Sequence, residues 1–384
     1  MKKFLMMLLA AVMVFVLAAC GGGNQGGSEA PAEEGGEEAA AMKVAMVTDY
    51  GDITDQSFNQ TTYEACKEFC EGSGVEFTYK KPASDADADR ISSIEEAIEE
   101  GYNVIVMPGY AFGPAIRETA PMYPEVKFVA LDVSEGDLTN YGQAEFDGSN
   151  VYSAVYQEEL AGYMAGYAAV KLGYKKLGFL GGMAVPAVQR YGHGFVQGAD
   201  AAASEGGVDG VEIKYVYGGQ FFGDADITAA MDTWYGAGTE CVFACGGGIF
   251  TSAAEAAAKT GGKVIGVDVD QAGIIDGGYG EGMTVTSAMK GLAPTVKTIL
   301  GAINDGNWDN YKNKIENLGL VSETPAENYV QLPDSTQWGD GFQQADYATL
   351  VKELFDGSRT VSNDIEKLPE VKAIKVDDQG AIKG

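Results

Sequence analysis

The chain has 384 residues, of which 46% are hydrophobic, so it can bury a sizeable core in two or three domains. Its formal net charge is −30, with 56 acidic residues against 26 Lys and Arg. A nucleic-acid-binding protein needs a basic surface that displaces the counterions of phosphates. The charge therefore argues against nucleic acid as a partner and against highly phosphorylated ligands.

The N-terminus has the pattern of a secretory signal. Lys2 and Lys3 precede an uncharged apolar run, Phe4–Ala19, which is short for a membrane span. The LAAC junction that follows resembles a bacterial lipobox, in which the cysteine is lipidated and becomes the mature N-terminus. We predict a signal peptide over 1–19 and lipidation of Cys20. An ordinary signal peptide with an incidental cysteine is the alternative.

Residues 20–41 are rich in glycine and glutamate and contain no large apolar side chain. Such a segment cannot form a core, and we expect a flexible tether there. With a lipidated cysteine at its start, the tether would hold the folded part at the extracytoplasmic face of the cell membrane.

From Met42 onward, short apolar runs alternate with stretches of helical periodicity. The runs lack in/out alternation, which is typical of parallel strands covered by helices on both faces. The runs are 43–48, 103–108, 127–132, 176–181, 241–246 and 263–268. This pattern predicts an α/β fold.

Three pairs of segments resemble each other, and they follow the same order along the chain. The pairs are 44–60 with 177–194, 104–120 with 242–258, and 127–133 with 263–269. Their shared order predicts two similar α/β lobes, over about 42–150 and 151–270. Independent βαβ patterning is the alternative.

Ligands of parallel sheets bind beyond the carboxyl ends of the strands, so two facing lobes would line one cleft. The strand-end residues are Asp49, Phe58, Asn59, Gly109, Tyr110 and Asp132 in the first lobe, and Tyr191, Gly246–Gly248 and Asp268 in the second. Phe58 and Tyr191 hold equivalent places, and two such rings could stack on a flat ligand. Alternatively, Phe58 only staples its helix to the core.

The carboxylates and glycines at these strand ends have two interpretations each. Carboxylates accept hydrogen bonds, so Asp132 and Asp268 suit hydroxyl or ring N–H groups of a neutral polar ligand. Helix capping is their alternative role. Gly246–Gly248 would let the backbone approach a ligand closely, or would form only a tight turn.

The sequence contains few of the residues and motifs that are typical of catalytic sites. His193 is the sole histidine, and the sequence contains neither a G-x-S-x-G elbow nor a phosphate-binding P-loop. Buried free thiols are the simplest interpretation of the four cysteines after Cys20, and a zinc site is the alternative. These cysteines are Cys66, Cys70, Cys241 and Cys245. We expect a binding protein without catalytic residues, cofactor or metal.

Six segments in order resemble the basic membrane protein family, which comprises bacterial solute-binding lipoproteins of ABC transporters, many of them specific for purine nucleosides. The segments are VTDYGDITDQSFNQ (47–60), YQEELAGYMAGYAA (156–169), LGFLGGM (177–183), RYGHGFVQGA (190–199), IGVDVDQ (265–271) and TSAMK (286–290). The resemblance covers roughly Met42 to Leu300. It implies a class I periplasmic-binding-protein fold, with two Rossmann-like lobes, three crossovers and a ligand cleft.

The resemblance also implies how the lobes divide the chain. The chain would return to the first lobe after about Val269, with 283–290 as a further strand. Lobe 1 would then comprise 42–150 and about 270–320. Lobe 2 would comprise 151–269 and part of the C-terminal region.

The resemblance implies a set of ligand-binding residues: Asp49, Phe58, Asn59, Asp132, Tyr191, Gly247, Asp268 and Lys290. Asp49 and Asn59 would bond the purine base, and Phe58 and Tyr191 would stack on it. The family more commonly has phenylalanine where this chain has Tyr191, whose hydroxyl would add a polar contact.

By the same likeness, Asp268 would accept hydrogen bonds from ribose hydroxyls and Lys290 would donate to the ribose side. Asp132 matches the aspartate of the family's fourth strand. Of the other acids near the first strand, we expect Asp55 to cap the helix that follows. Asp52 has no assigned role.

We therefore expect a monomeric, lipid-anchored protein that captures a nucleoside by hinge closure and delivers it to an ABC permease. A neutral nucleoside fits better than a nucleotide, because one lysine faces several carboxylates in the predicted cleft. The alternatives are a binding protein for a sugar or another small metabolite, a ligand-sensing lipoprotein, and a surface enzyme acting on nucleosides.

Overall fold

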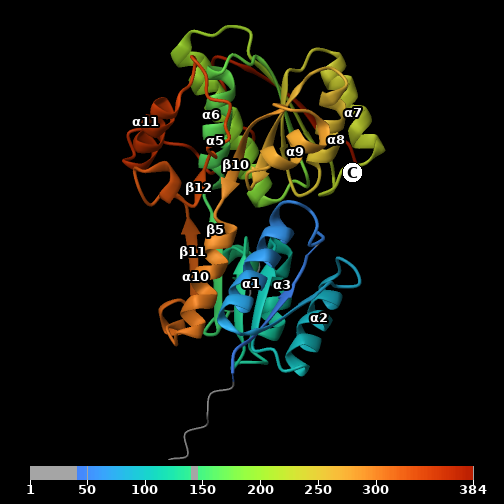
Figure 1. Ribbon diagram of the computed structural model, residues 1–384, viewed down its shortest axis with the longest axis vertical. Helices are drawn as coiled ribbons and strands as arrows, with labels where there is room; N and C mark the ends of the chain where they lie inside the picture. The colour runs from blue at the N-terminus through green and yellow to red at the C-terminus, as the bar shows by residue number, and fades with distance from the viewer. Residues whose placement is uncertain (1–40, 50, 140–145, 384) are drawn as a thin grey trace, which may run out of the picture. The chain divides into compact units, whose positions relative to one another are not determined.

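The computed structural model of the protein describes residues 41–49, 51–139 and 146–383 (Figure 1). The predicted signal peptide, the lipobox cysteine and nearly all of the predicted tether lie outside these residues. All elements named below belong to the unit Met42–Gly384. Among the described residues, no helix combines the length and apolar character that a membrane crossing requires.

The first sheet has six parallel strands in the order β11-β5-β4-β3-β1-β2. Its strands are β1 (Lys43–Val47), β2 (Glu76–Lys80), β3 (Val104–Pro108), β4 (Lys127–Leu131), β5 (Val151–Tyr156) and β11 (Lys314–Leu318). Every residue of β3 is buried, which explains why the apolar runs in the sequence do not alternate.

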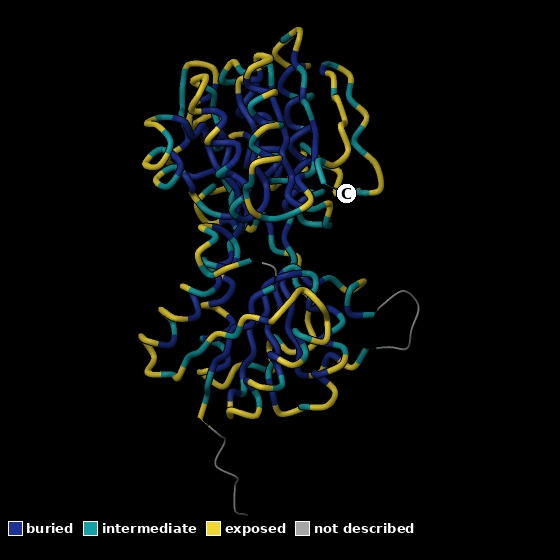
Figure 2. The backbone as a smooth tube through the Cα atoms, turned by 90° about the vertical axis from the view of Figure 1, so that its right-hand side faces the viewer, coloured by how far each residue is buried: buried dark blue, intermediate teal, exposed yellow. Residues whose placement is uncertain are grey.

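The second sheet has seven strands in the order β12-β10-β9-β8-β6-β7-β13, and only β12 is antiparallel to its neighbour. Its strands are β6 (Lys176–Gly181), β7 (Glu212–Tyr217), β8 (Cys241–Cys245), β9 (Lys263–Asp268), β10 (Thr284–Lys290), β12 (Val330–Gln331) and β13 (Lys375–Ala381). The buried strands of both sheets are visible as dark blue segments in Figure 2.

Helices cover both faces of each sheet, so each lobe has two core layers. The helices of the first lobe are α1 (Phe58–Ser73), α2 (Asp87–Glu99), α3 (Gly113–Thr119), α4 (Glu135–Thr139) and α10 (Leu292–Asn304). Those of the second are α5 (Glu158–Lys171), α6 (Pro186–Gly206), α7 (Ala225–Gly236), α8 (Phe250–Ala258), α9 (Ala272–Tyr279) and α11 (Gln344–Phe355).

The predicted duplication is confirmed by the strand order. The series β5-β4-β3-β1-β2 in one sheet corresponds to β10-β9-β8-β6-β7 in the other. The equivalence extends to backbone angles, because Asp132 and Asp268 follow β4 and β9 with φ of 62° and 65°. Gly109 and Gly246 follow β3 and β8 with φ of 132° and 143°. The sequence similarity therefore reflects two copies of one strand-end architecture.

The predicted boundaries between the lobes are wrong at two strands. Residues 151–156, expected in lobe 2, form β5 of the first sheet, and 283–290, expected in lobe 1, contain β10 of the second sheet. Each fifth strand pairs within its own sheet before the chain crosses over. The helix after it then packs in the other lobe, α5 on α6 and α10 on α1.

The crossings follow β5, β10 and β11, which agrees with the three that we expected. The segments that return to the first lobe are therefore α10 and β11. The C-terminal elements β12, α11 and β13 belong to the second lobe, as predicted for part of that region.

The four described cysteines are free and buried, as predicted for structural thiols. Cys66 and Cys70 belong to α1 in the first lobe, whereas Cys241 and Cys245 lie on β8 in the second. A zinc site shared by all four does not fit this arrangement. Among the described residues no group of potential metal ligands is found.

Helices α5 and α6 pack backbone against backbone through glycines. A Cβ atom at Gly162 or Gly166 of α5 would lie 2.1 Å from a carbonyl oxygen of α6. Gly194 and Gly198 of α6 are equally close to carbonyl oxygens of α5, at 2.1 and 2.0 Å. This approach, which only glycine permits, brings residues 191–198 of α6 against residues 159–166 of α5.

We predict that Gly166→Ala lowers the free energy of unfolding by about 3 kcal/mol, because the clash is with backbone and no rotamer relieves it. Urea unfolding would measure the change. Gly72→Ala is the matched control, because Gly72 is an exposed helical glycine with open space around it. That control should raise stability by up to about 1 kcal/mol. Equal effects of the two substitutions would contradict the packing argument.

Candidate functional site

A cavity of about 700 Å³, including its opening to solvent, lies at the carboxyl ends of both sheets. All eight residues predicted to bind ligand line it: Asp49, Phe58, Asn59, Asp132, Tyr191, Gly247, Asp268 and Lys290. The topology brings them together because the carboxyl ends of parallel strands lie at one edge of a sheet. Whether they bind a ligand is taken up below as a proposal.

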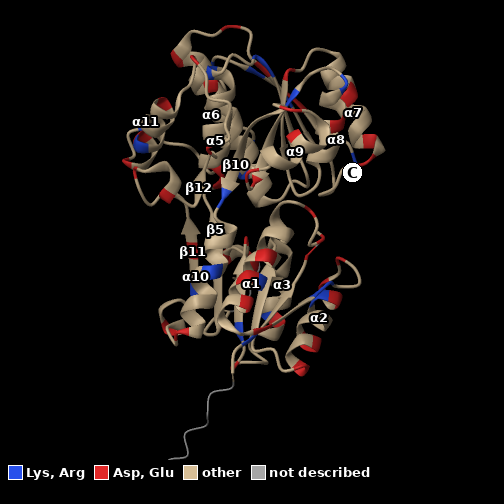
Figure 3. Cartoon of the chain, in the orientation of Figure 1, with Lys and Arg blue, Asp and Glu red and all other residues tan. Residues whose placement is uncertain are grey.

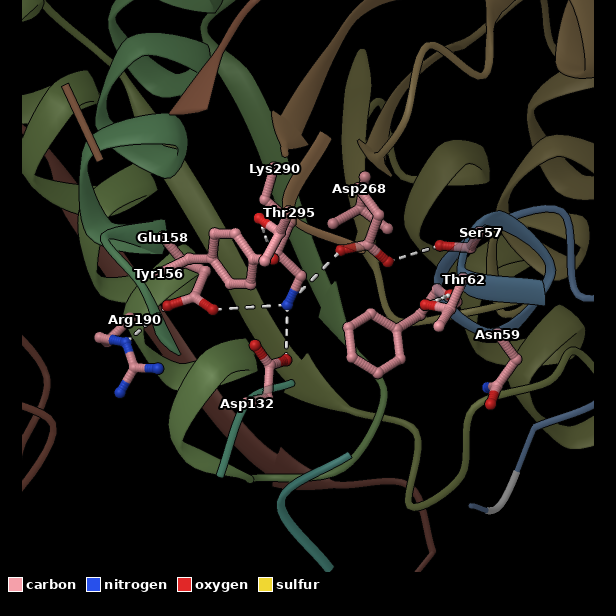
Figure 4. A network of polar contacts seen from close by, with 12 residues as sticks. Ser57, Asn59, Thr62, Asp132, Tyr156, Glu158, Arg190, Asp268, Lys290 and Thr295 are labelled. Carbon is pink, nitrogen blue, oxygen red and sulfur yellow. Dashed lines mark hydrogen bonds and ion pairs between the residues drawn. The ribbon is translucent and has the colours of Figure 1, made fainter. Parts of the chain in front are cut away.

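The electrostatic centre of the site is Lys290 at the end of β10 (Figure 4). Its Nζ lies 2.6 Å from Asp132 Oδ2, 3.4 Å from Glu158 Oε1 and 3.9 Å from Asp268 Oδ1. Arg190 Nε contacts the other carboxylate oxygen of Glu158 at 2.6 Å. Because Asp132 follows β4 of the first sheet, the Lys290 ion pair joins the two lobes.

Burial and pairing set the charges of this network. Burial would lower the pKa of Lys290, but its three carboxylate neighbours raise it, so the amine stays protonated. Burial raises the pKa of Asp132 to about 6 in spite of Lys290. Burial also favours a raised pKa for Glu158, but Arg190 and Lys290 outweigh it and bring that pKa below its ordinary value.

The two aromatic rings predicted to stack on a ligand face the same cation. Lys290 Nζ lies 4.6 Å from the ring centroid of Phe58 and 5.9 Å from that of Tyr191. Phe58 is half-buried, whereas the Tyr191 side chain is buried and packs edge-on against Phe243 with ring centroids 5.9 Å apart. The rings therefore come from different lobes to one cavity.

Three buried polar atoms of cavity-lining residues have no hydrogen-bond partner within the described residues: Asn59 Oδ1, Asp132 Oδ1 and the Tyr191 hydroxyl. The Asn59 amide is oriented by its Nδ2 group, which donates to Asp55 Oδ2 at 3.1 Å. Buried polar atoms are normally hydrogen-bonded. Two acceptors and one hydroxyl of the cavity lining thus leave hydrogen-bonding capacity unused among the described residues.

The three acids of the segment VTDYGDITDQSFNQ, in the loop after β1, have different contacts. Asp55 caps α1, as predicted, because its carboxylate accepts from the backbone N–H groups of Ser57, Asn59 and Gln60 at 2.9, 3.0 and 3.0 Å. Asp52 forms an exposed ion pair with Lys81 at 2.6 Å and does not line the cavity.

Asp49 lies where β1 and β3 end side by side. A Cβ atom at Gly109 would come within 2.2 Å of the Asp49 carboxylate, and φ of Gly109 is 132°. Glycine is therefore required here to let the Asp49 carboxylate lie against the neighbouring strand end. The sequence singled out Gly109 only as part of the loop.

Besides the Lys290–Asp132 pair, two hydrogen bonds between described residues join the lobes across the cleft. Ser57 Oγ donates to Asp268 Oδ2 at 2.6 Å, and Gln271 Nε2 donates to the carbonyl oxygen of Gln56 at 3.0 Å. Each joins the loop before α1 to the end of β9. One oxygen of Asp268, which we expected at a ribose, is thus used by Ser57. Sequence reasoning missed Ser57, although it belongs to the segment VTDYGDITDQSFNQ on which the family resemblance rests.

Phe221 is a cavity-lining residue that sequence reasoning missed. A Cβ atom at Gly182 or Gly246 would lie 2.5 or 3.0 Å from its ring, and one at Gly247 would lie 2.8 Å from its carbonyl oxygen. The glycines after β6 and β8 therefore make room for Phe221, while Gly247 also lines the cavity. The aromatic pair in the glycine-rich segment GGQFFG (218–223) was the sequence feature that could have identified Phe221.

We predict that Lys290→Met lowers the free energy of unfolding by about 3–5 kcal/mol at pH 7, because it leaves buried carboxylates unpaired. The deficit should shrink as the pH falls from 7 to 5. Without the lysine, the folded-state pKa of Asp132 rises further above its unfolded value, so protonation then favours the folded state.

Urea unfolding at several pH values would measure this effect. Lys297→Met serves as control, because Lys297 forms an exposed ion pair with Glu68. A Lys290→Met deficit that does not change with pH would contradict the network described above.

Comparison with known proteins agrees with this geometry. A family model described as "ABC transporter substrate-binding protein PnrA-like" matches residues 42–324. The chain is 28% identical over 307 residues to the ABC transporter nucleoside-binding protein BmpA of Lactococcus lactis, covering 74% of this chain and 83% of that protein. It is 26% identical to basic membrane protein B of Borreliella afzelii, covering 73% and 78% of the two chains.

A solved structure of an ABC transporter solute-binding protein from Aeropyrum pernix has the same fold, with a TM-score of 0.63 and 22% identity over 84% of this chain and 88% of that one. The expected fold of two Rossmann-like lobes is thus confirmed, as is the resemblance noted in the sequence. The chain belongs to the Bmp family of PnrA-like ABC transporter substrate-binding proteins.

Proposed function

We propose that this ABC transporter substrate-binding protein captures a neutral nucleoside, with a purine as the preferred base, by closure of its two lobes. The observation that carries the proposal is the meeting of two aromatic rings and three unpartnered polar atoms, Asn59 Oδ1, Asp132 Oδ1 and the Tyr191 hydroxyl, in one cavity. A nucleoside has a flat base, which can stack on the aromatic rings, and N–H and hydroxyl groups, which can bond the polar atoms. The nucleoside-binding relative from Lactococcus lactis supports the same class of ligand.

The charge of the cavity favours a neutral ligand over a nucleotide. Four of its lining residues are aspartates and one is a lysine, which already forms ion pairs with two of those aspartates. A phosphate group would face repulsion from the remaining carboxylates. Asp and Glu positions also outnumber Lys and Arg positions along α1, α2 and α7 (Figure 3).

In this proposal the base lies between Phe58 and Tyr191, with Asp49 and Asn59 at its edge. The ribose lies toward Asp268 and Lys290. Closure on the ligand forms the bonds that join the two lobes, and their loss accompanies release to the permease. The ligand thus completes a contact surface that neither lobe has alone.

The predicted signal peptide and the family support a proposal for location and partners. We propose an extracytoplasmic, lipid-anchored monomer that works with an ABC permease. A non-catalytic role fits the position of the single histidine, because His193 Nδ1 contacts the carbonyl oxygen of Asp364 and His193 is not among the cavity-lining residues.

Titration calorimetry with a ligand panel tests the proposal. The panel comprises inosine, guanosine, adenosine, a pyrimidine nucleoside, free purine bases, a nucleoside monophosphate, ribose and arabinose. We expect purine nucleosides to bind most tightly and the monophosphate to bind weakly or not at all. Binding of a sugar alone would replace the proposal with a sugar-binding function, and turnover of a bound nucleoside would indicate an enzyme.

We predict that Phe58→Ala and Tyr191→Ala each weaken nucleoside binding by about 1–3 kcal/mol, the contribution of one stacked ring. Calorimetry gives the change, and thermal unfolding shows whether the variant is folded. Tyr79→Ala is the control, because Tyr79 is exposed on β2 and does not line the cavity. Unchanged affinity in either variant would show that its ring is structural.

We further predict that affinity falls as the pH drops through about 6. A ligand donor at Asp132 Oδ1 favours the ionised carboxylate, so protonation of this group, whose pKa burial raises to about 6, competes with binding. Calorimetry between pH 5 and 8 measures the dependence. Asp132→Asn should remove most of it, because the amide retains an acceptor oxygen but does not titrate. The same pH profile in that variant would place the titrating group elsewhere.

A further inference from the structure

The loop of residues 218–223, between β7 and α7, forms part of the cavity wall. We call it the Phe221 loop. On its inner side Phe221 lies against glycines at the ends of β6 and β8, and its carbonyl oxygen accepts from Gly248 N at 2.8 Å. The residue after it, Phe222, is 59% exposed and does not line this cavity. The position of Phe221 therefore shapes the cavity.

The outer side of this loop is held by the segment 375–383, which we call the tail segment. It comprises β13 and the two residues that follow, and β13 pairs in parallel with β7. Ile382 N donates to the carbonyl oxygen of Tyr217 at 2.8 Å. Gly219, with φ of 84°, approaches Lys383 so closely that a Cβ atom there would lie 2.8 Å from the lysine carbonyl oxygen.

Lys383 connects the tail segment to the loop through a polar chain. Its ammonium group contacts the Asp224 carboxylate and lies 3.4 Å from Gln220 Oε1. Gln220 Nε2 in turn donates to Asp224 Oδ2 and to the carbonyl oxygen of Phe222, both at 2.9 Å. Asp224 also caps α7, so the loop is fixed at both ends.

Apolar burial does not explain the tail segment. Six of the seven residues of β13 are exposed, and the two apolar side chains of the segment that pack against core clusters, Val376 and Ile382, are only half-buried. The segment also lies beyond residues 42–324, the part of the chain that the family model matches. A segment that adds little to the core but contacts a cavity loop through backbone and charge has a positional role.

We propose that the tail segment positions the Phe221 loop, so that ligand affinity depends on Lys383 although this residue does not line the cavity. The proposal rests on the proposed function for its ligand. Removal of the Lys383 ammonium group frees Gln220 and Asp224 to rearrange, and the loop then holds Phe221 less firmly against the ligand. Lys383 is a positioning residue and makes no ligand contact.

The test is a double-mutant cycle with the tightest-binding nucleoside of the panel. Lys383→Ala should weaken binding about three- to fivefold, the scale of a single partly exposed ion pair. Phe221→Ala should weaken it as well, and Lys383→Ala should add no further loss in that background. Lys383→Arg should restore affinity. Lys352→Ala is the control, because Lys352 forms an exposed ion pair with Glu323 elsewhere in this lobe.

A second measurement needs no ligand. Backbone N–H groups of Gly218, Gly219 and Gly248 donate to carbonyl oxygens of Gly181, Gly182 and Phe221, so their hydrogen exchange reports loop order. Exchange should be faster in Lys383→Ala than in the wild type, and unchanged in Lys352→Ala. If no nucleoside binds the wild type, the proposed function fails, and exchange alone decides the role of the tail segment.

Two outcomes would overturn the inference. One is exchange that Lys383→Ala leaves unchanged. The other is an affinity loss of equal size with and without Phe221, because Lys383 would then act on the ligand by another route. Unchanged affinity with altered exchange would also refute it, since the loop would then move without consequence for binding.

Discussion

The buried ammonium group of Lys290 is the interaction on which the rest of the structure depends. A charge in a protein interior is tolerated only when it is paired, and here Asp132, Glu158 and Asp268 supply the pairing from both lobes. If the lobes separate, Asp132 moves away from its cation, and both groups then need water. In the proposed open form the cleft would supply that water, so opening and hydration of the site would be one process.

The rest of the fold brings the carboxylates that surround Lys290 close together. Equivalent left-handed backbone turns place Asp132 and Asp268 at the ends of β4 and β9. The glycine contacts between α5 and α6 bring Glu158 beside Arg190, which neutralises its second oxygen. An unpaired Glu158 would compete for the lysine. The close packing of two helices therefore also determines the electrostatics of the cavity.

Much of the fold and of the candidate site was predictable, because the polar residues at strand ends can be recognised from the short apolar runs that precede them. Asp49, Asp132 and Asp268 each follow an apolar run directly, and all three line the cavity. The lobe boundaries were not predictable. Nothing in the local sequence shows whether a strand near a crossover pairs with the sheet that precedes the crossover or with the sheet that follows it. Phe221 and Ser57 were missed for a related reason, since their partners lie in distant parts of the chain.

The crossovers after the two fifth strands have a consequence for how the chain acquires its structure. The first sheet lacks its edge strand β11 and its covering helix α10 until nearly all of the second sheet has been synthesised. Neither lobe is therefore a contiguous folding unit, and many stabilising contacts join residues far apart in sequence, which slows folding. A chain of this topology therefore completes its two lobes together rather than one after the other.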